Sequence, residues 1–236
     1  MRALPNQSRF STIEQICQSI NCDIWFLTET HEALIPSRGY FSHFSGIPDR
    51  DSDPGERWSA IWSKWPIEPL DSYATDLSRS VSGRISESAF GEIILYGTVL
   101  PWNTDPRAKN LGSFAAFAHA VEIQKSDWLK IQRDFPKATL IVAGDFNQSL
   151  VDRHYYGSKK KRVILEKILK ECELSPLTSG KNDPIARDSY PRACIDHICI
   201  ASKENWGVEK TSRWPDNPNP DLSLTDHFRV MLDLRI

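Results

Sequence analysis

The stretch Thr139–Gln148, TLIVAGDFNQ, joins an apolar run to a carboxylate and a carboxamide that lie two residues apart. The run from Leu140 to Ala143 predicts a buried strand. Residues two apart in a strand point to the same side, so we expect Asp145 and Asn147 to leave the edge of the sheet together. Two polar groups directed at one point, at the end of a buried strand, indicate a functional site.

The composition is that of an ordinary soluble domain. The chain has 236 residues, of which 40% are hydrophobic and 25% charged, and no Gly/Ser/Pro-rich linker divides it, so we expect one domain over residues 1–236. The formal charge of -2 gives no general attraction to nucleic acid, so binding of a polyanion would need a local patch.

The cysteines and the lack of long apolar runs predict a location. Five cysteines without a CxxC pair favour buried thiols in a reducing compartment over a disulfide framework or a zinc site. No apolar run approaches the ~18 residues of a membrane span. The first residues also lack the apolar core of a signal peptide. We therefore expect a cytoplasmic monomer that does not engage a membrane.

Apolar periodicity predicts strands and helices in mixed order. Helical spacing of apolar residues is found in three segments, 11–20, 114–135 and 164–172. Strand-like apolar runs occupy residues 23–28, 58–63, 93–100, 139–144, 194–201 and 228–236. Strands in runs that are interrupted by helices predict a layered α/β fold with a mixed sheet, rather than a strict alternation of strand and helix.

Polar residues capable of catalysis follow or begin four of these strands: Glu29, Asp145 with Asn147, Asp196, and Asp226 with His227. If these ends converge, they bring together carboxylates, a carboxamide and an imidazole. Hard oxygen ligands of this kind suit Mg²⁺ or Mn²⁺. A divalent cation beside a base and an imidazole can catalyse the hydrolysis of phosphoesters.

A family resemblance rests on ordered segments that together span residues 22 to 228: CDIWFLTETHE, SAIWSKWPI, GTVLPWN, GDFNQ, and the pair CIDHICI and LTDHF. GDFN alone occurs by chance, but the order and spacing of the segments are specific. At these segments the chain resembles the endonuclease/exonuclease/phosphatase superfamily, which includes apurinic endonucleases, deoxyribonucleases, inositol-phosphate phosphatases and neutral sphingomyelinases. The resemblance implies a four-layer α/β/β/α sandwich of two mixed β-sheets, with the site at one end.

The resemblance also implies a role for each strand-end residue. Glu29 is expected to be a metal ligand, with Asp226 near the same metal. The catalytic residues would divide the work as follows: Asp145 activates or positions the attacking water, Asn147 contacts the scissile phosphate, and Asp196 orients His227. Taken alone, an Asp-x-Asn pair is common turn chemistry, so this interpretation depends on the order of the motifs.

The predicted substrate contacts lie outside the strand ends. Asn103, at the exit of a predicted strand, is a candidate contact to the substrate. The consecutive cations Lys159, Lys160, Lys161 and Arg162 could hold a nucleic-acid backbone or a polyphosphate, although a solvated start of a helix explains them equally well.

The front of the chain departs from the family pattern. The family begins with a strand that carries a site asparagine, and residues 1–10 are too short to hold that strand and the loop after it. We therefore expect this first strand to be missing. Two explanations remain open: a degenerate protein, or a start codon assigned inside the first strand, which we favour because loss of an inner strand would leave its neighbour unpaired.

Together these features predict a phosphoester hydrolase that depends on Mg²⁺ or Mn²⁺, acting as a nuclease on DNA or RNA. One alternative is a phosphatase of a small phosphorylated metabolite or a lipid head group. The other is a non-catalytic binding module, suggested by the missing first strand.

Overall fold

The chain folds into layers of helix and sheet, and the computed structural model describes residues 7–88, 90–151, 155–186, 191–202, 204, 206–216 and 227–235. The helices are α1 (Gln7–Ile20), α2 (Ala108–Leu111), α3 (Ser113–Asp134) and α4 (Lys159–Glu171), with 3₁₀ turns η1 (Asp71–Tyr73) and η2 (Gly180–Asn182). The strands are β1 (Ile24–His31), β2 (Phe41–Phe44), β3 (Glu56–Ser63), β4 (Glu68–Pro69), β5 (Ser80–Ser88), β6 (Gly91–Val99), β7 (Thr139–Asp145), β8 (Ser175–Pro176), β9 (Asp196–Ala201), β10 (Gly207–Trp214) and β11 (Arg229–Arg235). Among these helices, none is both long and apolar enough to span a membrane.

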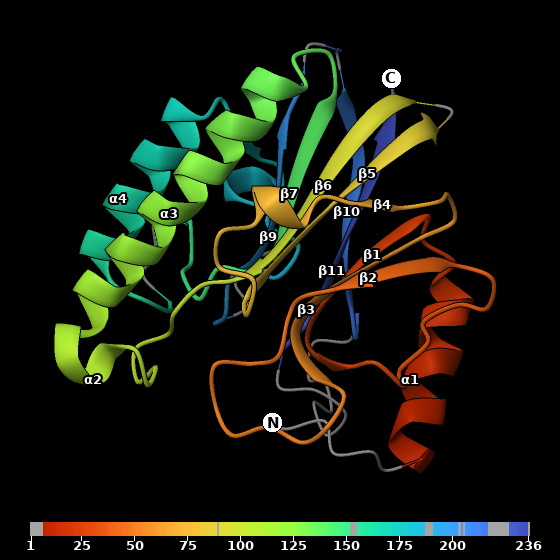
Figure 1. The fold of residues 1–236 in the computed structure, drawn as a ribbon, viewed down its shortest axis with the longest axis horizontal. Coiled ribbons are helices and arrows are strands. Elements are labelled where there is room, and N and C mark those ends of the chain that lie inside the picture. Colours follow the sequence, from red (N-terminus) through yellow and green to blue (C-terminus); the bar gives the residue numbers. More distant parts are fainter. Residues whose placement is uncertain are drawn as a thin grey trace.

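A mixed six-stranded sheet forms the centre of the molecule, in the order β4-β5-β6-β7-β9-β8. Its β6–β7 pair is parallel, and the other pairs are antiparallel. Helices α3 and α4 cover one face of this sheet, and α1 lies at the opposite side of the molecule (Figure 1). Between α1 and the large sheet lie two smaller antiparallel sheets, β1-β3-β2 and β10-β11. The expected α/β/β/α layering is confirmed, with the second β layer built from antiparallel pieces.

Alternation along the strands divides the core into layers, because successive side chains of a strand point to opposite faces. On β6, Ile94 and Tyr96 pack with Phe117 of α3. Their neighbours Ile93 and Leu95 pack between the sheets. All of these side chains are fully buried, which explains why β6 and β7 are the strands that the sequence predicts most directly.

Helix α1 is held by one apolar stripe. Phe10, Ile13 and Cys17 fall at helical spacing and pack against Trp25 of β1 and Trp62 of β3. The first turn of α1 lies at the far end of β1, since the ring centroids of Phe10 and His31 are 5.7 Å apart. Helix α1 therefore runs back along β1, which follows it in the chain.

Several strands were not expected from the sequence. Strand β5 reads SVSGRISES, and buried serines and a glycine stand where a strand pattern needs large apolar residues. Strand β10 reads GVEKTSRW and belongs to a small, partly exposed sheet, so its apolar pattern is weak.

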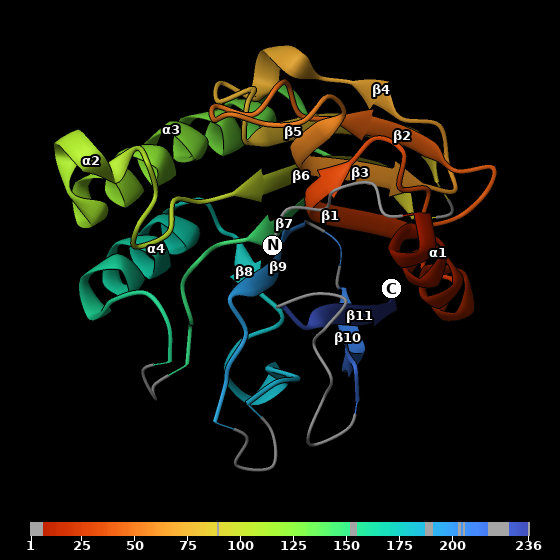
Figure 2. The same cartoon turned by 90° about the horizontal axis from the view of Figure 1, so that it is seen from below.

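The second β layer is divided in two (Figure 2). Within the described residues β1 pairs with β3 alone and β11 pairs with β10 alone. The prediction that the first family strand is missing concerns residues ahead of α1, which lie outside the described residues.

Candidate active site

The ends of β7 and β9 bring two carboxylates together. The strands are antiparallel, and Asp145 at the end of β7 lies opposite Asp196 at the start of β9. Asp196 Oδ2 in turn lies 3.0 Å from Nδ1 of His227, just ahead of β11. Ligand atoms of Asp145, Asp196 and His227 all lie within 4.8 Å of one another. The predicted catalytic residues therefore form one cluster.

The backbone around Asp145 explains the sequence of the motif. Gly144 has a φ of 141°, and a Cβ atom there would lie 2.0 Å from the carbonyl oxygen of Thr98. Only glycine allows β6 and β7 to approach so closely at this point. Asn147 has a φ of 49°, in the left-handed region that asparagine tolerates better than most residues. The motif thus combines a close strand contact with a sharp turn.

Asn147 holds the carboxylate of Asp145. Its backbone N–H donates to Asp145 Oδ1 at 2.8 Å. Its side-chain Nδ2 donates to Asp145 Oδ2 at 2.9 Å and to the carbonyl oxygen of Leu100 at 2.9 Å. Both side-chain amide hydrogens are used in this way, so Asn147 positions Asp145 in this arrangement, and the expected contact to phosphate stays a prediction.

The cluster accumulates negative charge in a buried place. Burial raises the pKa of Asp145 well above its usual range, and the charges of Asp196 and Glu29 raise it further. His227 and the hydrogen bond from Asn147 act in the opposite direction. Carboxylates held this close gain most from a cation among them, so the oxygen-rich donor set fits a hard divalent metal.

Glu29 lines the same cavity as the cluster. This cavity has a volume of about 580 Å³, and its walls include Asp145, Asp196 and His227. Glu29 belongs to β1, yet its φ is 47°, a left-handed conformation that costs free energy for a residue with a Cβ atom. Glu29 thus shares the cavity with the cluster, and its charge acts on Asp145. Asp226, the other expected metal position, lies outside the described residues.

The four-cation patch expected at the start of α4 is not present in that form. Lys159 and Lys160 are exposed, but Lys161 is buried with 1% of its surface accessible. Its Nζ donates to Oδ1 of Asn103 at 3.0 Å, and burial lowers its pKa. Arg162 is partly buried and donates to the carbonyl oxygen of Val151. The expectation of four exposed cations was therefore wrong, because Lys161 lies on the buried, apolar face of α4.

The helical period explains this correction. Lys161, Leu165 and Ile168 lie on one face of α4, at spacings of four and three residues. That spacing was visible in the sequence and would have predicted the burial of Lys161. The structure joins Asn103 to Lys161, beside the helix start, and neither residue lines the cavity that contains Asp145.

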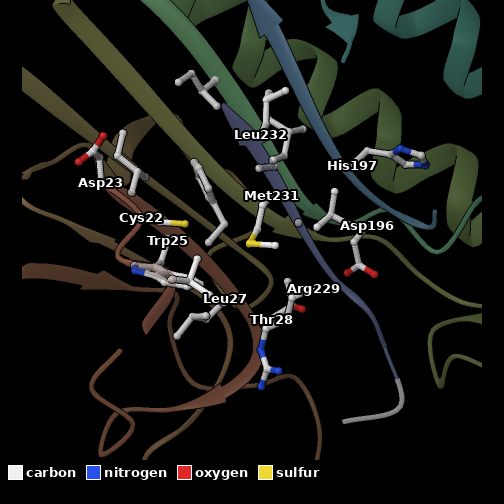
Figure 3. A pocket seen from close by; sticks show the side chains of 18 of the residues that line it. Cys22, Asp23, Trp25, Leu27, Thr28, Asp196, His197, Arg229, Met231 and Leu232 are labelled. Carbon is white, nitrogen blue, oxygen red and sulfur yellow. The ribbon is translucent and has the colours of Figure 1, made fainter. Parts of the chain in front are cut away.

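Two further residues lie near the site without having been expected there. Burial raises the pKa of Tyr156, and the charge of Asp145 raises it further. His197 is buried, and its Nε2 lies 3.0 Å from the carbonyl oxygen of Gln148, directly after Asn147. Burial lowers the pKa of His197, which favours a neutral ring. Asp196 and His197 point in different directions (Figure 3), as strand alternation requires.

An ionic cluster fixes the loop that follows β6. Arg79 is buried, and its guanidinium donates to Asp105 at 2.6 and 3.1 Å. Arg79 also bonds Asp49, and Arg107 bonds both Asp49 and Asp76. Because Val99 at the end of β6 lies opposite Asp145, this loop leaves the sheet at the same edge as the catalytic cluster.

Comparisons with solved structures find the same fold in other proteins. The catalytic domain of Xenopus laevis APE2 is 15% identical, with a TM-score of 0.65, and the match covers 98% of this chain and 89% of that one. A 3′-5′ exonuclease (NExo) from Neisseria meningitidis is 13% identical, with a TM-score of 0.67 and coverage of 96% and 94%.

A third match is the endonuclease/exonuclease/phosphatase from Beutenbergia cavernae, at 16% identity and a TM-score of 0.63. It covers 96% of this chain, which spans only 66% of the length of that protein. At such low identities these likenesses concern the fold. No curated protein matches by sequence.

The family itself is established by the sequence. The model of the endonuclease/exonuclease/phosphatase family matches residues 2–227, nearly the whole chain. The matched region contains every residue of the catalytic cluster, at the strand ends where the fold brings them together. The chain therefore belongs to the endonuclease/exonuclease/phosphatase family, whose members are in general metal-dependent phosphoester hydrolases and include both nucleases and phosphatases.

Proposed function

We propose that this protein hydrolyses phosphodiester bonds of nucleic acid with Mg²⁺ or Mn²⁺. The observation that carries the proposal is the cluster of Asp145, Asp196 and His227, with ligand atoms within 4.8 Å of one another, on the cavity that Glu29 also lines. Glu29 and Asp196 would hold the cation, with Asp226 as a further ligand. When bound, the cation would neutralise charge on the phosphoryl oxygens.

The other catalytic roles are assigned to side chains of the protein. Asp145 is the proposed general base, because a carboxylate whose pKa is raised accepts a proton from water more readily. Asn147 keeps the Asp145 carboxylate in one orientation through two hydrogen bonds. Asp196 holds His227 by Nδ1, so that the imidazole is oriented to stabilise the negative charge that develops on the phosphoryl group.

The test is hydrolysis of labelled single-stranded and duplex oligonucleotides by the purified chain with Mg²⁺ or Mn²⁺. Asp145→Asn should lower kcat by about 10³-fold or more, because it removes a group needed mainly in the transition state. Glu87→Gln, a matched change at an exposed carboxylate of β5, should have no effect. Cleavage at the same rate by the Asp145→Asn variant would reject the proposal.

A second candidate, hydrolysis of a small phosphoester, is favoured by one observation. Only Lys159 and Lys160 of the expected four-cation run are exposed, which leaves a small surface for a long polyanion. Release of phosphate from small esters, without cleavage of oligonucleotides, would identify this activity. If neither substrate class is turned over above the Asp145→Asn background, the chain is a binding module of the same fold.

A further inference from the structure

The loop that follows β6 leaves the sheet beside the catalytic cluster. The backbone N–H of Leu100 donates to the carbonyl oxygen of Asp145 at 2.8 Å, and the carbonyl oxygen of Leu100 accepts a hydrogen bond from Asn147 at 2.9 Å. Trp102 is two residues further along the chain, so its Cα atom lies within about 7 Å of that of Leu100. Trp102 is partly exposed. It is therefore an aromatic side chain at the border of the proposed active site.

Trp102 rests on a second tryptophan. The ring centroids of Trp102 and Trp58 are 5.5 Å apart, and the ring planes form an angle of 56°. Trp58 is buried, and its Nε1 donates to Asp49 at 2.7 Å. In the register of the two strands, the position of Trp58 on β3 falls beside that of Glu29 on β1. The two tryptophans thus connect the Glu29 side of the site with the loop after β6.

Two guanidinium groups hold this arrangement in place. Arg79 Cζ lies 4.9 Å from the ring centroid of Trp58 and 5.3 Å from that of Trp102, and Arg50 Cζ lies 4.1 Å from the ring centroid of Trp58. Arg79 also donates to Asp105, three residues after Trp102, at 2.6 Å. The loop is therefore held on the far side of Trp102 as well. An aromatic surface that is fixed before binding loses little conformational entropy when a ligand stacks on it.

The next residue, Asn103, has a side-chain amide in a fixed orientation. Its Oδ1 accepts hydrogen bonds from Nζ of Lys161 at 3.0 Å and from Oγ of Ser113 at 3.4 Å. An ammonium group can only donate, so the oxygen of the amide must lie on this side and Nδ2 on the other. Because Asn103 is exposed, its Nδ2 can donate to a ligand.

Helices α3 and α4 begin next to Asn103. Phe114 follows Ser113 in the chain, and 43% of its surface is exposed. Lys159 and Lys160 precede Lys161 and are also exposed. Aromatic rings beside cations are the combination that binds single-stranded nucleic acid, because bases stack on the rings and phosphates are attracted by the cations.

We propose that Trp102, Asn103 and Phe114 form a subsite for unpaired nucleotides next to the scissile phosphate, which we call the stacking subsite. Bases stack on the two rings, Asn103 donates to a phosphate oxygen, and Lys159 and Lys160 attract the backbone. The face of a base is accessible only when the base is unpaired, so the stacking subsite selects single strands over duplexes. The inference rests on the proposed function, because it names single-stranded nucleic acid as the substrate of that hydrolase.

The experiment measures binding in EDTA, which prevents metal-dependent hydrolysis. Fluorescence anisotropy follows the binding of labelled oligothymidine, oligouridine, a duplex, and an abasic sugar-phosphate chain with the same number of phosphates. The parent should bind the single strands more tightly than the duplex and the abasic chain. Trp102→Met should weaken binding of the single strands about tenfold, as expected for the loss of one stacked base, and leave binding of the abasic chain unchanged. Trp102→Phe, which keeps a ring, should retain most of the affinity.

Matched controls come from the opposite end of β3. Trp65→Met changes a partly exposed tryptophan just after this strand. Phe41→Ala changes a phenylalanine that is 46% exposed and pairs with Ser63. Neither change should affect binding. Phe114→Ala removes an exposed ring and should weaken binding of the single strands about fivefold, so it tests the proposal even if Trp102→Met does not fold.

Equal binding of the single strands and the abasic chain by the parent would overturn the proposal. Unchanged affinity in Trp102→Met and Phe114→Ala would overturn it as well, and so would an equal loss on the abasic chain. Hydrolysis gives a separate answer. Cleavage of oligonucleotides by a Trp102→Met variant of unchanged affinity would reject the stacking subsite alone, whereas ring-dependent binding without cleavage would keep the stacking subsite and reject the proposed hydrolysis.

Discussion

At the scale of single residues, the catalytic cluster stores unfavourable charge that a metal would relieve. The carboxyl of Asp145 is buried, and the negative charges of Asp196 and Glu29 both act on it. Without a cation the charges of Asp196 and Glu29 repel the charge of Asp145, and a bound cation would attract all of them. Stability and metal response should change in opposite directions when one of these charges is removed.

Glu29→Gln tests this relation. Without metal the variant should be as stable as the parent or more stable, because one negative charge near Asp145 is gone. With Mn²⁺ the half-saturating concentration should rise about tenfold or more, as expected for the loss of a carboxylate ligand. The measurement is the melting temperature over a Mn²⁺ titration. Identical titration curves for the parent and the variant would show that Glu29 does not bind the metal.

Asn147 allows hydrogen bonding to be separated from backbone strain. Asn147→Gly loses the bonds of Nδ2 to Asp145 and Leu100, which should lower the free energy of unfolding by about 1–3 kcal/mol. Asn147→Ala loses the same bonds but keeps a Cβ atom at a φ of 49°, so it should be less stable than Asn147→Gly by about 1–2 kcal/mol. Urea unfolding of both variants measures the difference. Equal stabilities would mean that the turn relaxes.

At the scale of elements, the sequence predicts those strands and helices whose apolar pattern is strong. Strand β7 and helix α3 were expected close to their observed bounds because most of their buried residues are apolar. Strand β5 was missed because Ser80 and Ser82 are buried there in place of large apolar residues. Partners across a sheet, which make such a strand stable, are not visible in a local pattern.

The site could be predicted to a similar extent. Asp145, Asp196 and His227 were expected together, because motif order placed them at strand ends. The hydrogen bonds from the side-chain amide of Asn147 to Asp145 and Leu100 could not be predicted from the sequence. They depend on which groups the fold brings close together. The burial of Lys161 followed from the helical period but was obscured by the run of four cations.

The exposed cations of α4 lead to a prediction for substrate binding. Changing Lys159 and Lys160 to glutamate should weaken binding of a single-stranded oligonucleotide about tenfold or more and flatten its salt dependence. The matched control changes Lys167 and Lys170, exposed near the other end of the same helix, to glutamate. Fluorescence anisotropy over a range of salt measures both. Equal losses in the two double variants would indicate a general charge effect.

At the scale of the whole molecule, the ionic cluster of Asp49, Asp76, Arg79, Asp105 and Arg107 ties distant loops to the edge of the large sheet. Burial acts to raise the pKa of Asp76, but hydrogen bonds from Arg107 and its positive charge outweigh burial and lower it. Burial also acts to raise the pKa of Asp49, but the positive charges of Arg79 and Arg107 outweigh burial and lower it. The folded protein therefore binds protons at these carboxyls less readily than the unfolded chain.

This difference predicts acid sensitivity with a defined sign. A carboxyl whose folded pKa is lowered stabilises the protein above its unfolded pKa of about 4, and that stability is lost as the pH falls through the folded pKa. Asp76→Asn should cost about 1–3 kcal/mol at pH 7 and progressively less below about pH 4. Urea unfolding from pH 7 down to about pH 2.5 tests this. A constant difference across that range would contradict the assignment.

The small size of the β10-β11 sheet has a consequence for how the protein responds to heat. Two-stranded sheets are marginal in water, and most side chains of β10 and β11 are partly or fully exposed. This sheet should open locally before the β6-β7-β9 centre melts. Because His227 lies two residues before β11 and bonds Asp196, local opening would dismantle the catalytic cluster while most of the molecule is still folded. Heat inactivation of the proposed hydrolase would then be a reversible event several degrees below the melt seen by far-UV circular dichroism, and cooling would restore activity without refolding of the core.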